Sequence, residues 1–146
     1  MRTRCLLVLV LVALAAAVFS GADLAAPAAG PSVTVNSTKF GRILFDGTNR
    51  ALYGFTRDRR GKSTCYGACA EAWPPYIVRG TLRSGTGTKR ALIATTRRRD
   101  GSRQLTYAGK PLYYYVHDPR GQVLCQNVNE FGGLWLVVRP SGKLVR

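Results

Sequence analysis

Reactive side chains gather in one short stretch of the sequence, Leu112 to Gly121, which reads LYYYVHDPRG. It holds three consecutive tyrosines, the only histidine, His117, and the carboxylate of Asp118. Imidazole and carboxylate groups serve as general acids and bases in enzymes. One histidine permits a single Ser-His-Asp or Cys-His arrangement, and the sequence has no Gly-x-Ser-x-Gly motif and no Walker-type loop. The sequence therefore predicts no catalytic residue, and it favours a protein that is not an enzyme.

The cysteines Cys65, Cys69 and Cys125 are the second group that could do chemistry. With His117 they have the composition of a Cys3His zinc site, but nothing in their spacing makes four ligands converge. Disulfide-exchange enzymes use Cys-x-x-Cys, which is one residue shorter than the spacing here, and a haem would need Cys-x-x-Cys-His. We expect no metal and no cofactor, and keep a redox or metal- or haem-associated envelope protein as the alternative function.

Residues 1–22 have the layout of a secretory signal peptide. Arg2 and Arg4 precede an apolar run from Cys5 to Phe19, and the small residues 20–22 offer a cleavage site. The run is shorter than the roughly 20 residues that a membrane-spanning helix needs. Residues 23–31, rich in Ala, Pro and Gly, predict a flexible spacer. We expect residues 32–146 to form a single domain outside the cytoplasm, either secreted or associated with the cell envelope.

Positive charge dominates the remaining chain. Without Arg2 and Arg4 it keeps 20 basic residues against 7 acidic ones, a net charge of about +13. Such a charge favours an anionic partner in the envelope. Between residues 79 and 103 there is one acid, Asp100, among eight basic residues: Arg79, Arg83, Lys89, Arg90, Arg97, Arg98, Arg99 and Arg103.

Two interpretations of this basic run stay open. It is either an ordinary solvated loop or a contact surface, for which Arg97, Arg98 and Arg99 are the candidate binding residues. Aromatic residues do not interleave with the run, and stacking of bases would require them. We therefore expect no specific nucleic-acid partner.

The sequence repeats itself after 60 residues, as the pair Tyr53 and Tyr113 illustrates. The same shift aligns Leu52 with Leu112, Phe55 with Tyr115, Asp58 with Asp118, Gly61 with Gly121 and Cys65 with Cys125, and without a gap Ile77-Val78 with Val137-Val138. Two copies of one unit are predicted, a first repeat at about 33–78 and a second repeat at about 93–138, joined by a basic linker at 79–92.

Each repeat has the pattern of β-strands. Apolar runs flank the turn formers of residues 46–49 in the first repeat and Ala108-Gly109 in the second, which predicts hairpins. Residues 134–146, LWLVVRPSGKLVR, predict a closing hairpin around Pro140-Ser141-Gly142. Only residues 65–73 suggest a helical turn, which Pro74-Pro75 would end. We expect a mainly β domain of two tandem β-meanders, packed with pseudo-two-fold symmetry, and one short helical turn.

The repeated residues have a structural explanation. Alternation along a strand puts Tyr53 and Phe55 on one face, and Tyr113 and Tyr115 on the equivalent face. Asp58 and Asp118 start four-residue segments that end in glycine, as in type I turns. The candidate binding residues of the second repeat are therefore the two that differ from the first, Tyr114 in place of Gly54 and His117 in place of Arg57.

The segments LYGFTRD, GKSTCYGACAEAWPP, GKPLYYYVHD and GGLWLVV resemble a secreted repeat family of predicted bacterial lipoproteins that carries a Tyr-x-aromatic-x-x-Asp motif. The resemblance covers about Val33 to Val138. It implies an exported, envelope-associated protein with no established activity. The motif falls on Tyr53, Phe55, Asp58, Tyr113, Tyr115 and Asp118. The chain departs from the lipoprotein pattern because Cys5 lies at the start of the apolar run, not after it at the cleavage site where a lipid would be attached.

Two pairings of the cysteines remain open. Cys65 and Cys69 are one helical turn apart, which a disulfide tolerates with local distortion. A bond from either of them to Cys125 would instead join the two repeats and close a longer loop. We favour Cys65–Cys69, partly because the resemblance implies it. Taken together, the sequence predicts an exported binding or structural module without enzymatic activity, whose basic surface contacts an anionic envelope component.

Overall fold

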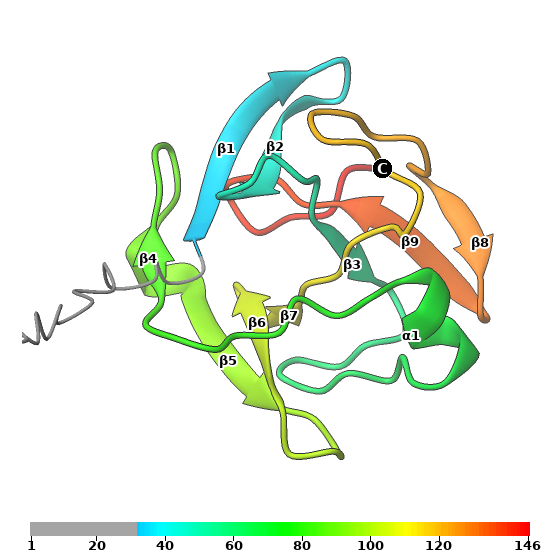
Figure 1. Cartoon of the computed structure of the whole chain (residues 1–146). Helices are drawn as coiled ribbons and strands as arrows, with labels where there is room; N and C mark the ends of the chain where they lie inside the picture. Colours follow the sequence, from blue (N-terminus) through cyan, green and yellow to red (C-terminus); the bar gives the residue numbers. More distant parts are fainter. Residues whose placement is uncertain (1–31) are drawn as a thin grey trace, which may run out of the picture.

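The computed structural model describes residues 32–146. The predicted signal peptide and spacer lie outside the described residues. The elements are β1 Ser32–Thr38, β2 Gly41–Asp46, β3 Tyr53–Phe55, α1 Ala68–Ala72, β4 Arg83–Ser84, the 3-10 turn η1 Arg90–Leu92, β5 Ile93–Arg97, β6 Arg103–Tyr107, β7 Lys110–Pro111, β8 Val128–Glu130 and β9 Gly133–Val137 (Figure 1). The mainly β class is confirmed, and the expected helical turn is α1. Within the described residues no helix is long and apolar enough to cross a membrane.

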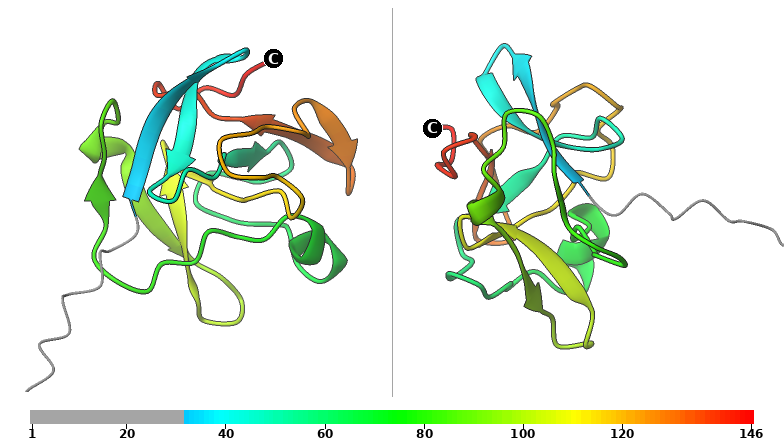
Figure 2. Two further views of the ribbon diagram at one scale, coloured as in Figure 1. Left: turned by 45° about the horizontal axis from the view of Figure 1, so that its top comes forward. Right: turned by 90° about the vertical axis from the view of Figure 1, so that its left-hand side faces the viewer.

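The strands form three small sheets of three strands each. β1 lies between β2, to which it is antiparallel, and the short β4, to which it is parallel. β6 lies between β5 and β7, and β9 lies between β3 and β8. Figure 2 shows the three sheets from two further sides, with the β5–β6 hairpin projecting from the rest. The predicted linker, residues 79–92, carries β4 and the 3-10 turn η1, which the sequence did not indicate.

Neighbouring residues of the central strands face two different hydrophobic clusters, as alternation in a strand requires. The first cluster contains Trp73 and Trp135, whose rings stack with centroids 4.2 Å apart. The residues that alternate along the strands are divided as follows: Phe45, Tyr53, Tyr113 and Val137 in the first cluster, and Leu44, Leu52, Leu112 and Val138 in the second. The central strands are therefore buried on both faces.

The last strand of each repeat pairs with the motif strand of the other repeat. β3 of the first repeat lies antiparallel to β9 of the second, with Tyr53 opposite Val137. In the second repeat, Tyr113 forms a bridge with Pro75 of the first. The two motif strands also pair with each other, because Tyr53 and Tyr113 exchange two N–H···O=C bonds of 2.9 Å. The repeats are thus interlocked, and each completes the sheet of the other.

The ungapped alignment of the repeats is wrong at its end by two residues. Leu44 donates its N–H to the carbonyl of Val138, and Leu105 donates its N–H to the carbonyl of Tyr76, both at 2.8 Å. Tyr76, not Val78, is therefore the structural equivalent of Val138. The reason is a longer connection in the second repeat, where the β8–β9 hairpin replaces α1.

Candidate functional site

The repeated motif is a reciprocal clasp between the repeats. The Tyr53 hydroxyl donates to the Oδ2 atom of Asp118 at 2.5 Å, and the Tyr113 hydroxyl donates to the Oδ2 atom of Asp58 at 2.6 Å. Each motif tyrosine thus binds the motif aspartate of the other repeat. Both phenol rings are fully buried. Burial raises the pKa of both tyrosines far above the ordinary value, so these hydroxyls are fixed proton donors.

The motif aspartates also organise the loops that follow them. Asp58 accepts hydrogen bonds from the N–H and the hydroxyl of Thr64, at 2.7 and 2.8 Å, and Asp118 accepts one from the N–H of Leu124 at 2.9 Å. Burial raises the pKa of both carboxyls, against the lowering effect of these hydrogen bonds. The turns themselves span residues 59–62 and 119–122, one residue later than we expected, because the carboxylates reach forward to position 64 or 124 instead of starting the turn.

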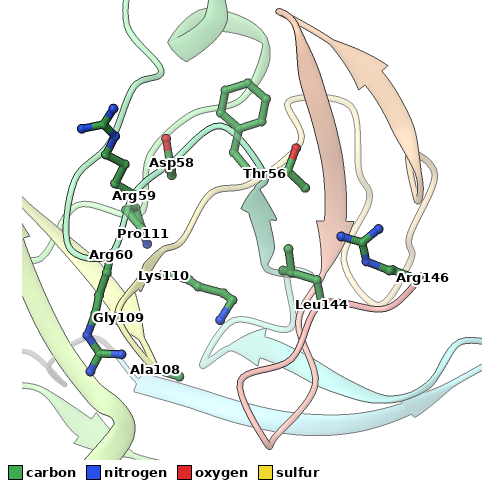
Figure 3. A pocket seen from close by; sticks show the side chains of 11 residues that line it. Thr56, Asp58, Arg59, Arg60, Ala108, Gly109, Lys110, Pro111, Leu144 and Arg146 are labelled. Atoms are coloured by element: carbon green, nitrogen blue, oxygen red, sulfur yellow. The ribbon is translucent and has the colours of Figure 1, made fainter.

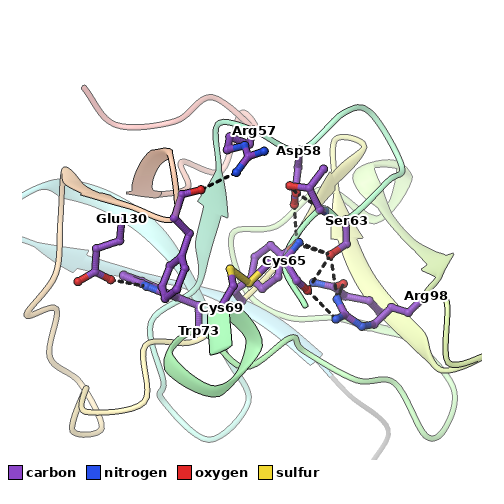
Figure 4. The surroundings of a disulfide bond; sticks show 12 residues. Arg57, Asp58, Ser63, Cys65, Cys69, Trp73, Arg98 and Glu130 are labelled. Carbon is purple, nitrogen blue, oxygen red and sulfur yellow. Dashed lines mark hydrogen bonds between the residues drawn. A yellow bond between two sulfur atoms is a disulfide. The ribbon is translucent and has the colours of Figure 1, made fainter. Parts of the chain in front are cut away.

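The disulfide joins Cys65 and Cys69, with an S–S distance of 2.00 Å and Cα atoms 5.3 Å apart. Both cysteines are buried, and the preferred pairing is confirmed. Figure 4 shows the bond between the Asp58 loop and Trp73, whose Nε1 atom donates to Glu130 at 2.9 Å. Cys125 is a half-buried free thiol. Among the described residues no group of three His, Cys, Asp or Glu side chains could hold a metal ion.

The three candidate arginines occupy different environments. Arg97 and Arg99 are exposed, whereas Arg98 is only 5% exposed. The Nη1 atom of Arg98 donates to Ser63 Oγ at 2.9 Å and to Gln104 Oε1 at 2.7 Å, and its Nη2 atom donates to the Cys65 carbonyl at 2.7 Å (Figure 4). Its guanidinium therefore ties the basic turn to the disulfide loop, and it is a positioning residue for the two exposed arginines.

The basic turn itself has a simple local cause. Arg97 ends β5, and the chain returns into β6 with Arg103 opposite it. Asp100 accepts hydrogen bonds from the N–H and the hydroxyl of Ser102, which lower the pKa of this carboxyl. Gly101 has a φ of +83°, a conformation that glycine adopts without strain. The tight turn holds consecutive arginines at the end of the hairpin.

A hollow of about 460 Å³ lies between this turn and the disulfide loop, and we call it the hairpin pocket. Its lining combines five basic side chains with Ser63, Thr64 and Tyr66 and includes no carboxylate: the basic residues are Arg59, Lys62, Arg97, Arg98 and Arg99. The guanidinium carbons of Arg98 and Arg99 lie 4.3 and 4.5 Å from the centre of the Tyr66 ring. The pocket can attract an anion through several cations at once.

The sequence did not single out Arg59, Lys62 or Tyr66 as members of this site. They lie more than thirty residues before Arg97, and only the fold brings them together. One signal was present in the repeats: Pro119 and Gln122 occupy the positions that correspond to Arg59 and Lys62. The first repeat therefore carries positive charge at two positions where the second repeat has none.

Tyr114 and His117 do not form one site with the arginines. The half-buried Tyr114 donates its hydroxyl to Asp46 at 3.0 Å, and the Arg50 guanidinium lies 4.2 Å from its ring centre. Burial raises the pKa of Tyr114 well above its usual range. His117 is exposed, and its ring meets that of Tyr115 edge to face at 5.4 Å. Their roles as binding residues remain predictions.

Comparison with known proteins gives one match. Residues 34–76 and 94–139 fit the model of a family described as a secreted repeat of unknown function. The two matched segments agree with the repeats seen in the fold, including the later end of the second. No curated protein and no solved structure matches the chain.

Proposed function

Since the chain belongs to this family of secreted repeats of unknown function, we propose that it is an exported, non-enzymatic module that binds an anionic component of the cell envelope through the hairpin pocket. The observation that carries the proposal is the lining of that pocket by basic side chains from two parts of the fold. Its location outside the cytoplasm follows from the family; association with the envelope is part of the proposal.

The charge balance of the described residues supports this assignment. The arginine hydrogen bonds run to backbone carbonyls, a hydroxyl or an amide, as in Arg57 with Phe131 and Arg98 with Gln104. Several carboxylates instead accept from tyrosine, tryptophan or serine, as Glu130 does from Trp73. The positive charge of Arg97 and Arg99 is therefore left for a partner outside the chain.

The redox or metal alternative is less well supported. It would require Cys65, Cys69, Cys125 and His117 to act together. Cys65 and Cys69 are bonded to each other, whereas Cys125 is a free thiol outside this bond, and His117 packs against the Tyr115 ring. Counting thiols and bound metal in the purified protein tests this alternative directly: more than one free thiol, or bound zinc or iron, would support it over our proposal.

Binding to an anionic polymer immobilised on beads tests the proposed function. We expect R97S/R99S to weaken binding by about 25-fold, since one charge near an anionic surface contributes about 1 kcal/mol, or roughly fivefold. R79S/R83S is the matched control, because it removes two exposed arginines from another part of the chain. Arg98 is left intact because its loss would disturb the fold. Equal binding of both double variants would contradict the proposal.

A further inference from the structure

A second basic hollow adjoins the hairpin pocket at the junction of the two repeats. Its volume is about 340 Å³, and we call it the junction pocket. Its walls come from residues 55, 56 and 58–60 of the first repeat, residues 108–111 of the second, and Leu144 and Arg146. Arg59 lines both pockets. The two hollows are therefore neighbours that share a cation.

Four basic side chains line the junction pocket: Arg59, Arg60, Lys110 and Arg146. Figure 3 shows Lys110 and Arg146 extending toward each other from opposite sides of the space. The one acidic side chain in the lining is that of Asp58, whose carboxylate already accepts from Tyr113 and Thr64. Within the described residues, the charged ends of the four cations make no hydrogen bond or ion pair. They are available to an external anion.

The equivalent arginine of the second repeat shows that this arrangement is specific to the first. Arg120, the counterpart of Arg60, donates to the carbonyl of Thr48 and so serves the fold. Arg60 instead lies over Gly109, where an added Cβ atom would come within 2.8 Å of the Arg60 Cγ atom. Gly61 fixes the two loops, because its N–H donates to the Gly109 carbonyl at 2.7 Å. Gly109, which has no Cβ atom, thus leaves space for the Arg60 side chain, whose charge is not paired within the described part of the fold.

We propose that the hairpin pocket and the junction pocket form one track for a linear polymer of phosphate groups; this inference rests on the proposed function and names its ligand class. Guanidinium groups bind phosphate oxygens through paired hydrogen bonds, which adds geometric specificity that the point charge of a lysine lacks. Arg59, at the boundary of the two hollows, makes the line of cations continuous.

A flexible chain fits this track better than a membrane surface or a nucleic acid. The cations line two hollows instead of one flat face, so a planar headgroup layer would reach only their rims. Stacking of bases requires open aromatic faces. In the hairpin pocket, Arg98 and Arg99 cover the Tyr66 ring, and in the junction pocket Phe55 is only 5% exposed. The charge of the polymer backbone is therefore what the track recognises.

Titration calorimetry with inorganic polyphosphate of different lengths tests this inference on the exported protein. We expect long polyphosphate to bind roughly a hundredfold more tightly than tripolyphosphate, because a long chain engages both pockets at once. K110S/R146S removes two cations from the junction pocket alone, and we expect it to lose most of this length advantage. R79S/R83S is again the control with the same net charge, and thermal unfolding checks that each variant is folded.

The outcomes separate this inference from the proposed function. If long polyphosphate binds no more tightly than tripolyphosphate, or if K110S/R146S keeps the full length advantage, the track is wrong, while binding at the hairpin pocket can still be lost in R97S/R99S. If R97S/R99S keeps its binding, the proposed function fails. Tighter binding to phosphatidylglycerol vesicles or to single-stranded DNA than to long polyphosphate would also overturn the choice of ligand.

Discussion

The two repeats share a motif strand but continue from it in different ways. After Cys65 the first repeat forms α1, whereas after Cys125 the second repeat forms β8, which pairs with β9. Ala68, Ala70 and Ala72 are good helix formers, while Val128 is β-branched and favours a strand. The same supersecondary unit thus accepts a helix or a strand at one position, according to local propensity.

The difference also shows how each repeat secures its last strand. β9 is held by β8 and β3 through ladders of hydrogen bonds. The corresponding segment of the first repeat contains Pro74 and Pro75, which have no N–H to donate. There the Cys65–Cys69 disulfide fixes α1 directly before Trp73. The covalent bond therefore stabilises the repeat that has fewer strand hydrogen bonds.

Removing the disulfide should give the largest effect. We expect C65S/C69S to lower the free energy of unfolding by roughly 2 kcal/mol, the loop-closure contribution of so short a loop. C125S, the equivalent change in the second repeat, should cost less than about 1 kcal/mol because Cys125 has no disulfide. Urea unfolding of both variants provides the measurement. An equal loss would show that the two repeats do not differ in the way described.

Breaking the clasp should have the next largest effect, and an unequal one. Y53F should cost about 1.5–3 kcal/mol, as expected for a hydrogen bond to a charged group. Y113F should cost less, because Asp58 keeps two donors from Thr64, whereas Asp118 keeps only the Leu124 N–H. The Tyr113 hydroxyl also bonds Ser63 Oγ at 2.7 Å, but Ser63 keeps its hydrogen bond from Arg98 in Y113F. Y66F is the control, since the Tyr66 hydroxyl accepts only a long bond of 3.4 Å. Urea midpoints in the reverse order would contradict the comparison.

The smallest expected effect is a dependence of stability on pH. Burial raises the pKa of Asp58 and Asp118 above the ordinary 3.8, so the folded chain binds these protons more tightly than the unfolded chain. Their stabilising contribution is complete below pH 3.8 and is lost as the pH rises through the raised values. The lowered pKa of the exposed Asp100 acts in the opposite direction.

Urea unfolding at about pH 7 and pH 4.5 compares the wild type with D58N and D118N. We expect acidification to raise the urea midpoint of the wild type relative to that of either variant. The reason is that the amide of each variant does not titrate in this range. The variant with the larger difference identifies the repeat whose carboxyl carries more of the effect. Identical responses in all three proteins would rule out both aspartates as the source.

Much of the fold was predictable because strand alternation and turn chemistry are local properties. The β class and the repeats follow from patterns such as Tyr53-Gly54-Phe55, and the family resemblance favours the Cys65–Cys69 pairing that the fold contains. The exchange of last strands was not predictable, because Tyr113 could pair with its own repeat as well as with Pro75 of the other. The hairpin pocket could not be predicted for the same reason, because only the fold brings Lys62 and Arg97 together.

The exchange of last strands also bears on how many repeats a chain of this kind needs. In a single repeat the motif strand would lack the last strand of the other repeat, and its own last strand would be left unpaired at an exposed edge. Two separate copies could close by swapping these strands, as domain-swapped dimers do. The reciprocal Tyr53–Asp118 and Tyr113–Asp58 bonds are the contacts expected across the axis of such a dimer. Repeats of this design therefore complete their sheets only in pairs, and an unpaired repeat would have to associate with a repeat of another molecule.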